Sequence, residues 1–137
     1  MKQVDELIRG EISAVESINA VLRNVKDNAE KSALEQMLQD HKLAVDKLKR
    51  FAEPEFESKS KSSGPWGTFT SAFAGGASFF GDKAALTALK VGEQHGLNEY
   101  QEALKDDSIN QDVRQLIQNE LIPNQERHLQ TINQYMQ

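Results

Sequence analysis

Apolar residues recur every three or four positions along four long stretches of the chain, which is the spacing of one face of an α-helix. In the first stretch, this face is formed by Val4, Ile8, Val15, Ile18, Leu22 and Val25. Alternating steps of three and four are typical of helices packed in a bundle. The same spacing predicts long helices over residues 3–26, 29–51, 82–105 and 109–136. We therefore expect an all-α protein built as a four-helix bundle.

Short polar connections predict that these helices form two antiparallel hairpins, over residues 3–51 and 82–136. Asp27 and Asn28 favour a break between the first two helices, and Ser32 and Ser108 begin candidate capping boxes. Pro123 lies within the fourth helix and predicts a bend one turn before His128.

Residues 52–81 separate the two hairpins and differ from them in composition. Pro54 ends the second helix, and a Ser/Lys-rich linker follows it. Four aromatic residues then recur at helical spacing on either side of Gly75-Gly76: Trp66, Phe69, Phe73 and Phe80. We expect a long crossover that contains a short amphipathic helix laid on the bundle. We expect this aromatic set to cover the core rather than to anchor the chain to a membrane, since few lysines lie near it, and a further hypothesis is that it mediates homo-oligomer formation. The whole chain, residues 1–137, is expected to be one domain.

Each long helix carries one ionisable residue on its apolar face, where a charge is costly unless it is paired or bound to a cation. The four residues are Glu11, His41, Glu93 and His128. Carboxylate and imidazole side chains that converge inside a bundle make a site for iron, manganese or zinc. Counted from the hairpin turns, however, each Glu and its His differ in height by about 8 Å. Glu16 lies closer in height to His41, so a Glu16–His41 hydrogen bond competes with a shared metal site.

Net charge and residue usage narrow the functional classes. The chain carries a formal net charge of -5 and has no basic cluster, so we do not expect a nucleic-acid partner. It has no cysteine, and its serines fall in linkers and on helix surfaces, which leaves no candidate catalytic nucleophile and argues against an enzyme.

The third histidine, His95, is expected on the surface. The N-terminus is charged throughout, and no apolar run is long enough to cross a membrane, so a cytoplasmic protein is expected.

Several stretches resemble a bacterial family catalogued as domain of unknown function 2383. They are LIRGEISAVESI, GDKAALTALKVGEQHGLNEYQEAL, the tryptophan-containing segment GPWG, and ELIPNQERHL. The resemblance implies a ferritin-like up-and-down four-helix bundle with a long crossover between the second and third helices. It implies no particular reaction.

Ferritin-like proteins hold two metals through a Glu on one helix and Glu-x-x-His on the next, repeated. By this resemblance Glu11 and Glu93 match the single Glu positions, and His41 and His128 match the histidines. Leu38 and Gln125 stand where the bridging carboxylates would be. A mononuclear site, or a polar cluster left in the core, therefore fits the chain better than an oxygen-activating di-iron centre.

Two hypotheses for the function follow. The first is a non-enzymatic bundle that acts by assembly or by binding a partner in a stress setting, with the buried Glu and His residues specifying helix register. The second is a metal-binding protein with Glu11, His41, Glu93 and His128 as ligands and Glu16 behind them. The missing carboxylates favour the first hypothesis.

Overall fold

The computed structural model describes residues 2–52 and 82–136, and all the regular secondary structure within these ranges is helical. The helices are α1 (Lys2–Leu22), α2 (Asn28–Lys49), α5 (Asp82–Leu104) and a last long helical run. This run consists of α6 (Gln111–Leu116), a π-helix η3 (Ile117–Leu121) and α7 (Ile122–Met136). The expected helical bundle is therefore confirmed.

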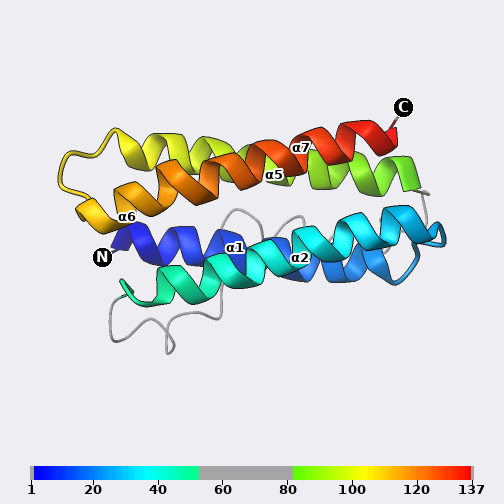
Figure 1. The fold of residues 1–137 in the computed structure, drawn as a ribbon, viewed down its shortest axis with the longest axis horizontal. Coiled ribbons are helices and arrows are strands. Elements are labelled where there is room, and N and C mark those ends of the chain that lie inside the picture. The colour runs from blue at the N-terminus through cyan, green and yellow to red at the C-terminus, as the bar shows by residue number, and fades with distance from the viewer. Residues whose placement is uncertain (1, 53–81, 137) are drawn as a thin grey trace.

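The helices are arranged as two hairpins that pack against each other (Figure 1). α1 pairs with α2, and α5 pairs with the α6–η3–α7 run, while α1 also packs on α5 and α2 on α7. Figure 1 shows that every helix runs antiparallel to both of its neighbours, and that α2 ends and α5 begins at opposite ends of the bundle. The predicted amphipathic helix, and with it Trp66, Phe69, Phe73 and Phe80, lies outside the described residues.

Polar side chains set the ends of the helices. α1 ends at Leu22, four residues before the predicted end at Lys26. α2 begins directly after Asp27, whose carboxylate accepts a hydrogen bond from the backbone N–H of Glu30 at 2.9 Å. This cap replaces the expected one at Ser32, because Asp27 already satisfies a free N–H of the first turn.

The helix that follows the second hairpin turn is capped two residues later than predicted. The side chain of Asn110 accepts from the backbone N–H of Asp112 at 2.7 Å and caps α6. Ser108, the predicted cap, instead donates from both its backbone N–H and its hydroxyl to Asp106. The guanidinium of Arg114 donates to the carbonyl groups of Leu104 and Asp106 and thereby ties the end of α5 to α6.

The predicted irregularity at Pro123 takes the form of the π-helix that precedes it. In this turn the N–H of Ile122 donates to the carbonyl of Ile117, five residues back. A π-turn accommodates one extra residue, and the buried face of the run continues at Gln125, while Asn124 is only partly buried. The buried positions of the run are Val113, Ile117, Leu121, Gln125, His128 and Ile132.

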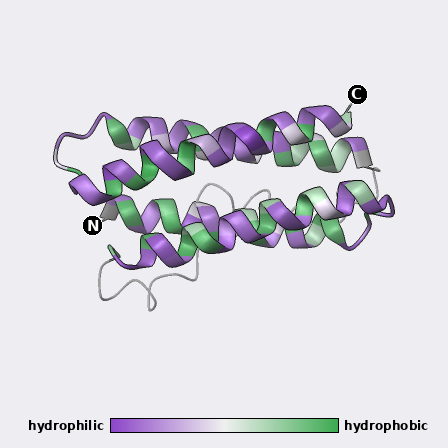
Figure 2. Ribbon diagram, in the orientation of Figure 1, coloured by the Kyte–Doolittle hydropathy of each residue, from purple (hydrophilic) through white to green (hydrophobic). Residues whose placement is uncertain are grey.

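The hydrophobic core is divided into two clusters. One cluster occupies the end of the bundle near the N-terminus and includes Ile8, Leu48, Tyr100, Val113 and Ile117. The other occupies the opposite end and includes Ile18, Leu34, Leu38, Leu89 and Ile132. Hydrophilic residues predominate in the middle of the α5–α7 pair in Figure 2. This break in the core marks a buried polar layer.

Candidate functional site

The buried polar layer contains all four ionisable residues that interrupt the apolar faces. Their exposed fractions are 5% for Glu11, 2% for His41, 1% for Glu93 and 2% for His128. His41 lies at the centre, where Nδ1 donates to Oε2 of Glu11 at 2.5 Å and Nε2 donates to Oε1 of Glu93 at 2.6 Å. His128 lies on the other side of Glu93, with Nδ1 3.5 Å from Oε2. The four helices therefore bring these residues into one connected group.

The contacts correct two expectations. The estimated height difference of about 8 Å does not keep each Glu apart from its His, because the side chains of both pairs are in contact. The predicted Glu16–His41 hydrogen bond is also wrong, since Glu16 is exposed and both ring nitrogens of His41 are bonded to other carboxylates. α1 ends earlier than expected, so the turn takes up residues that the estimate counted as helix.

The charges in the layer stabilise one another. Burial alone would lower the pKa of His41, but attraction to Glu93 and Glu11, together with hydrogen bonds to both, raises it well above its ordinary value of 6.5. Burial would raise the pKa of Glu93, but the charge of His41 and the hydrogen bonds from both histidines lower it to about 2. In the metal-free chain His41 is therefore an imidazolium held between two carboxylates.

Tyr100 on α5 extends the group at the Glu11 end. Its hydroxyl donates to Oε1 of Glu11, and burial together with the negative charge of Glu11 raises the pKa of the phenol well above 10. Tyr100 follows Glu93 by seven residues in the sequence, a spacing that puts both residues on the same face of a helix. Nothing in that pattern signalled that its hydroxyl faces a carboxylate on another helix.

Asp40 on α2 extends the group at the His128 end. Nε2 of His128 donates to Oδ2 of Asp40 at 2.8 Å, and the guanidinium of Arg127 donates to the same oxygen at 3.0 Å. Burial would raise the pKa of Asp40, but hydrogen bonds from His128 and Arg127 lower it. No pattern in the sequence indicated a role for Asp40, because it immediately precedes His41 and falls beside the apolar stripe rather than on it.

Three of the four predicted residues are positioned to hold one metal ion. One ligand atom each from His41, Glu93 and His128 lies within 4.8 Å of the others. Glu11 bonds to Nδ1 of His41, on the side of the ring away from Glu93, and so lies behind this histidine. Glu11 and Asp40 each fix the second nitrogen of one histidine, which is how carboxylates orient the histidine ligands of metal sites.

The two positions that lack a carboxylate serve other purposes. Leu38 packs in the apolar cluster at the end of the bundle away from the N-terminus. The amide of Gln125 donates through Nε2 to the backbone carbonyl of Glu93 at 2.9 Å, which fixes the α5–α7 contact beside the layer. Neither side chain offers a bridging carboxylate for a second metal.

His95, the third histidine, is half-buried and lies outside the layer, where Nε2 is 3.1 Å from Oε1 of Glu99. The helices that the structure describes include none that is long and apolar enough to span a membrane.

Comparison with known proteins places most of the chain in one family. The family model described as "Domain of unknown function (DUF2383)" matches residues 1–106, a range that contains Glu11, His41 and Glu93 and ends before His128. No curated protein and no solved structure matches the chain.

Proposed function

The chain belongs to the DUF2383 family, whose description names no function, and from the geometry of its own residues we propose that it binds one divalent transition-metal ion. The ligands are Nε2 of His41, the carboxylate of Glu93 and Nδ1 of His128. Two imidazoles with one carboxylate suit iron, manganese or zinc. The bundle is of the ferritin-like kind, with a crossover between α2 and α5, but with one metal in place of two.

The orientation of His128 carries this proposal. Asp40 only accepts hydrogen bonds when ionised, so Nε2 of His128 donates to it, which leaves Nδ1 as the ring nitrogen that would bind a metal ion beside Glu93. The 3.5 Å between Nδ1 and Oε2 of Glu93 is long for a hydrogen bond. It is close to the separation of about 3.3 Å between two ligands on a tetrahedral zinc ion.

The fit is less good at His41. Nε2 of His41 and Oε1 of Glu93 are 2.6 Å apart, so this pair must separate by about 0.7 Å to share one ion. His41 must also give up its proton, because a metal binds the neutral ring. Glu11 then keeps its bond to Nδ1 and orients the ring.

Charge balance supports a divalent ion. When both imidazoles are neutral, the buried part of the layer holds two carboxylates, Glu11 and Glu93, while Asp40 and the exposed guanidinium of Arg127 neutralise each other at its edge. A net charge of minus two inside a bundle is costly, and a divalent cation compensates it. Such an ion would act there as a Lewis acid or as a redox centre.

A second candidate function rests on the completeness of the metal-free network. Every ring nitrogen of His41 and His128 already faces a carboxylate oxygen. On this alternative the layer fixes helix register in a non-enzymatic bundle that acts through assembly or a partner, and no metal is bound.

Metal analysis after reconstitution separates the two candidates. The purified chain is stripped with a chelator, incubated with Zn²⁺, Mn²⁺ or Fe²⁺ under anaerobic conditions, and desalted before elemental analysis. We expect about one equivalent of metal in the wild type and in His95→Gln, and loss of that metal in His128→Gln. His95 is the matched control because it is a histidine on the same bundle outside the layer. Equal metal content in both variants, or none in the wild type, refutes the metal site and leaves the structural network.

A further inference from the structure

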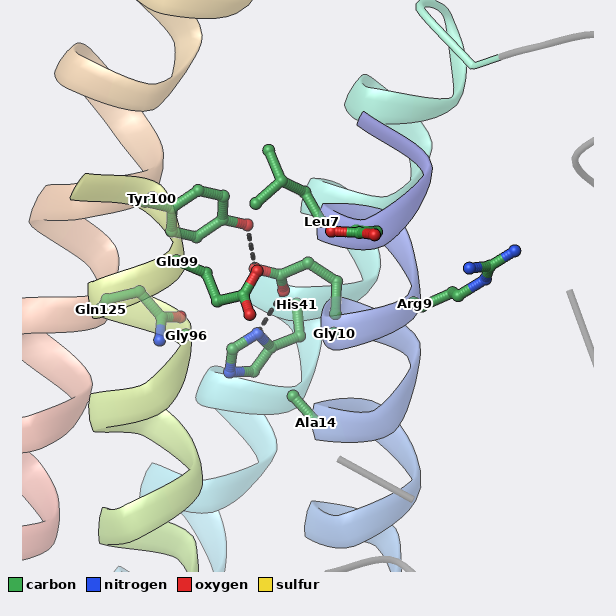
Figure 3. A pocket seen from close by; sticks show the side chains of 11 residues that line it. Leu7, Arg9, Gly10, Ala14, His41, Gly96, Glu99, Tyr100 and Gln125 are labelled. Carbon is green, nitrogen blue, oxygen red and sulfur yellow. Dashed lines mark hydrogen bonds and ion pairs between the residues drawn. The ribbon is translucent and has the colours of Figure 1, made fainter. Parts of the chain in front are cut away.

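A cavity of about 160 Å³ lies between α1 and α5, directly beside the polar layer (Figure 3). Gly10 on α1 and Gly96 on α5 both line it, and neither carries a side chain that would fill the space. The side chains of Leu7 and Ala14 form apolar parts of its wall. An apolar cavity of roughly 150 Å³ is large enough to hold a benzene ring. The space is therefore suited to a compact organic molecule.

The polar groups at this cavity are mostly acidic. Glu11 and Tyr100 line its inner side, where the hydroxyl of Tyr100 bonds to the carboxylate (Figure 3). Oε1 and Oε2 of Glu11 are bonded to Tyr100 and His41 respectively, and each oxygen of a carboxylate has two lone pairs. Glu11 therefore retains acceptor capacity beside the unfilled space.

Three charged residues nearer the solvent determine which ligand the cavity favours. Glu99 on α5 lines the cavity with a side chain that is 33% exposed. Arg9 also lines it, but Figure 3 shows its guanidinium directed away from Tyr100 and His41. The exposed residue Glu6 adds another carboxylate to the lining. The cavity thus combines apolar walls with an excess of negative charge.

We propose that this cavity binds a small organic ammonium ion, with its apolar body against Leu7, Gly10 and Gly96 and its charged head between Glu99 and Glu11. An ammonium group has three N–H donors and no acceptor, which matches the carboxylates of Glu11 and Glu99, since ionised carboxylates only accept. The body is limited to about one ring or a short branched chain by the cavity volume. Of the three proposed metal ligands, Glu93 and His128 do not line the cavity, whereas His41 lies in its wall next to Glu11.

Binding is measured by ligand-detected NMR and calorimetry on the chelator-treated chain, so the outcome does not depend on whether a metal is bound. The probes are benzylamine, its neutral analogue benzyl alcohol, its anionic analogue benzoate, and ammonium chloride. We expect saturable binding of benzylamine, about tenfold tighter than that of benzyl alcohol, because only the amine forms charge-assisted hydrogen bonds. Benzoate is expected not to bind.

Two variants with matched controls locate the site. Glu99→Gln is expected to weaken benzylamine binding about fivefold, the effect of losing one partly exposed ion pair. Glu102→Gln, at an exposed position on the same helix, is expected to leave it unchanged. Gly96→Leu fills the cavity and is expected to abolish binding, whereas Gln101→Leu on the exposed side of α5 retains it.

Several outcomes would overturn the proposal. Equal affinity for benzylamine and benzyl alcohol would mean that the cavity does not select charge. Displacement of benzylamine by ammonium chloride at equal concentration would indicate an inorganic cation site. Absence of saturable binding, or equal effects of Glu99→Gln and Glu102→Gln, would remove the site altogether. If Gly96→Leu does not fold, as judged by circular dichroism, the Glu99 and Glu102 pair still decides the question.

Discussion

Replacing Tyr100 with phenylalanine removes one hydroxyl from the polar layer and changes little else. Tyr100 is 2% exposed, and its hydroxyl is a donor to the buried carboxylate of Glu11. Phenylalanine retains the ring in the apolar cluster but leaves Oε1 of Glu11 without this donor. Leaving a buried polar group without its hydrogen-bond partner lowers stability by about 1–3 kcal/mol, and the loss for a charged group lies in the upper part of that range. We expect Tyr100→Phe to lower the free energy of unfolding by about 2 kcal/mol, or the melting temperature by about 7 °C.

Urea denaturation followed by circular dichroism, in the presence of a chelator, measures this change. The slope of the free energy against urea concentration should stay constant, because the variant changes stability rather than the surface exposed on unfolding. Tyr135→Phe is the control, since Tyr135 is a half-buried tyrosine on α7 at the opposite end of the bundle. We expect it to change stability by less than about 0.5 kcal/mol.

A double-mutant cycle with Glu11→Gln tests whether the loss comes from the Tyr100–Glu11 hydrogen bond. An uncharged amide at position 11 needs a donor less than a carboxylate does, so Tyr100→Phe should cost less in that background. We expect a coupling energy of about 1 kcal/mol. If Tyr100→Phe is as mild as Tyr135→Phe, or if the cycle shows no coupling, the idea that Tyr100 stabilises a buried charge is refuted.

Two further predictions concern pH and the support of His128. The raised pKa of His41 contributes stability that is fully present below pH 6.5 and is lost as the pH rises through the pKa of His41 in the folded chain. The lowered pKa of Glu93 contributes stability that is present above pH 4.5 and is lost as the pH falls toward about 2. The urea midpoint of the metal-free chain is therefore expected to be highest between pH 4.5 and 6.5. Glu93→Gln should weaken the decline of this midpoint below pH 4.5. An unchanged decline in the variant would contradict the attribution of the acid dependence to Glu93. Asp40→Asn is expected to weaken metal binding about 10- to 100-fold, because the carboxylate that accepts from Nε2 of His128 and orients its ring is lost. Competition with a chromogenic chelator measures this affinity. Asp46→Asn at an exposed position on α2 should have no effect, and equal affinities of the two variants would count against Asp40 as a support.

The sequence predicted the residues of the layer but not their contacts. Glu11, His41, Glu93 and His128 could be found because each replaces an apolar residue in a regular pattern, which is visible along one helix at a time. Tyr100 is amphipathic and fits such a pattern, so its hydroxyl bond to α1 leaves no trace in it. Asp40 lies beside the pattern and is recruited only because α7 packs against α2 at that height. Contacts of this kind depend on the relative position of two helices. One extra residue in a π-turn rotates the side chains that follow it by about 100° around the helix axis and moves them about 1.5 Å along it, which is enough to change their hydrogen-bond partners.

The two candidate functions correspond to two ways of neutralising the same layer. With both imidazoles neutral, the carboxylates of Glu11, Glu93 and Asp40 outweigh Arg127 by two charges, and a folded core at this depth requires compensation. In the metal-free chain His41 holds a proton and supplies part of it. A divalent ion on His41, Glu93 and His128 would supply all of it and would displace that proton. A metal-binding chain should therefore lose the alkaline decline in stability when zinc is added, because the ion is held by a ring that no longer titrates. A layer that serves register alone should keep that decline whatever metal is present.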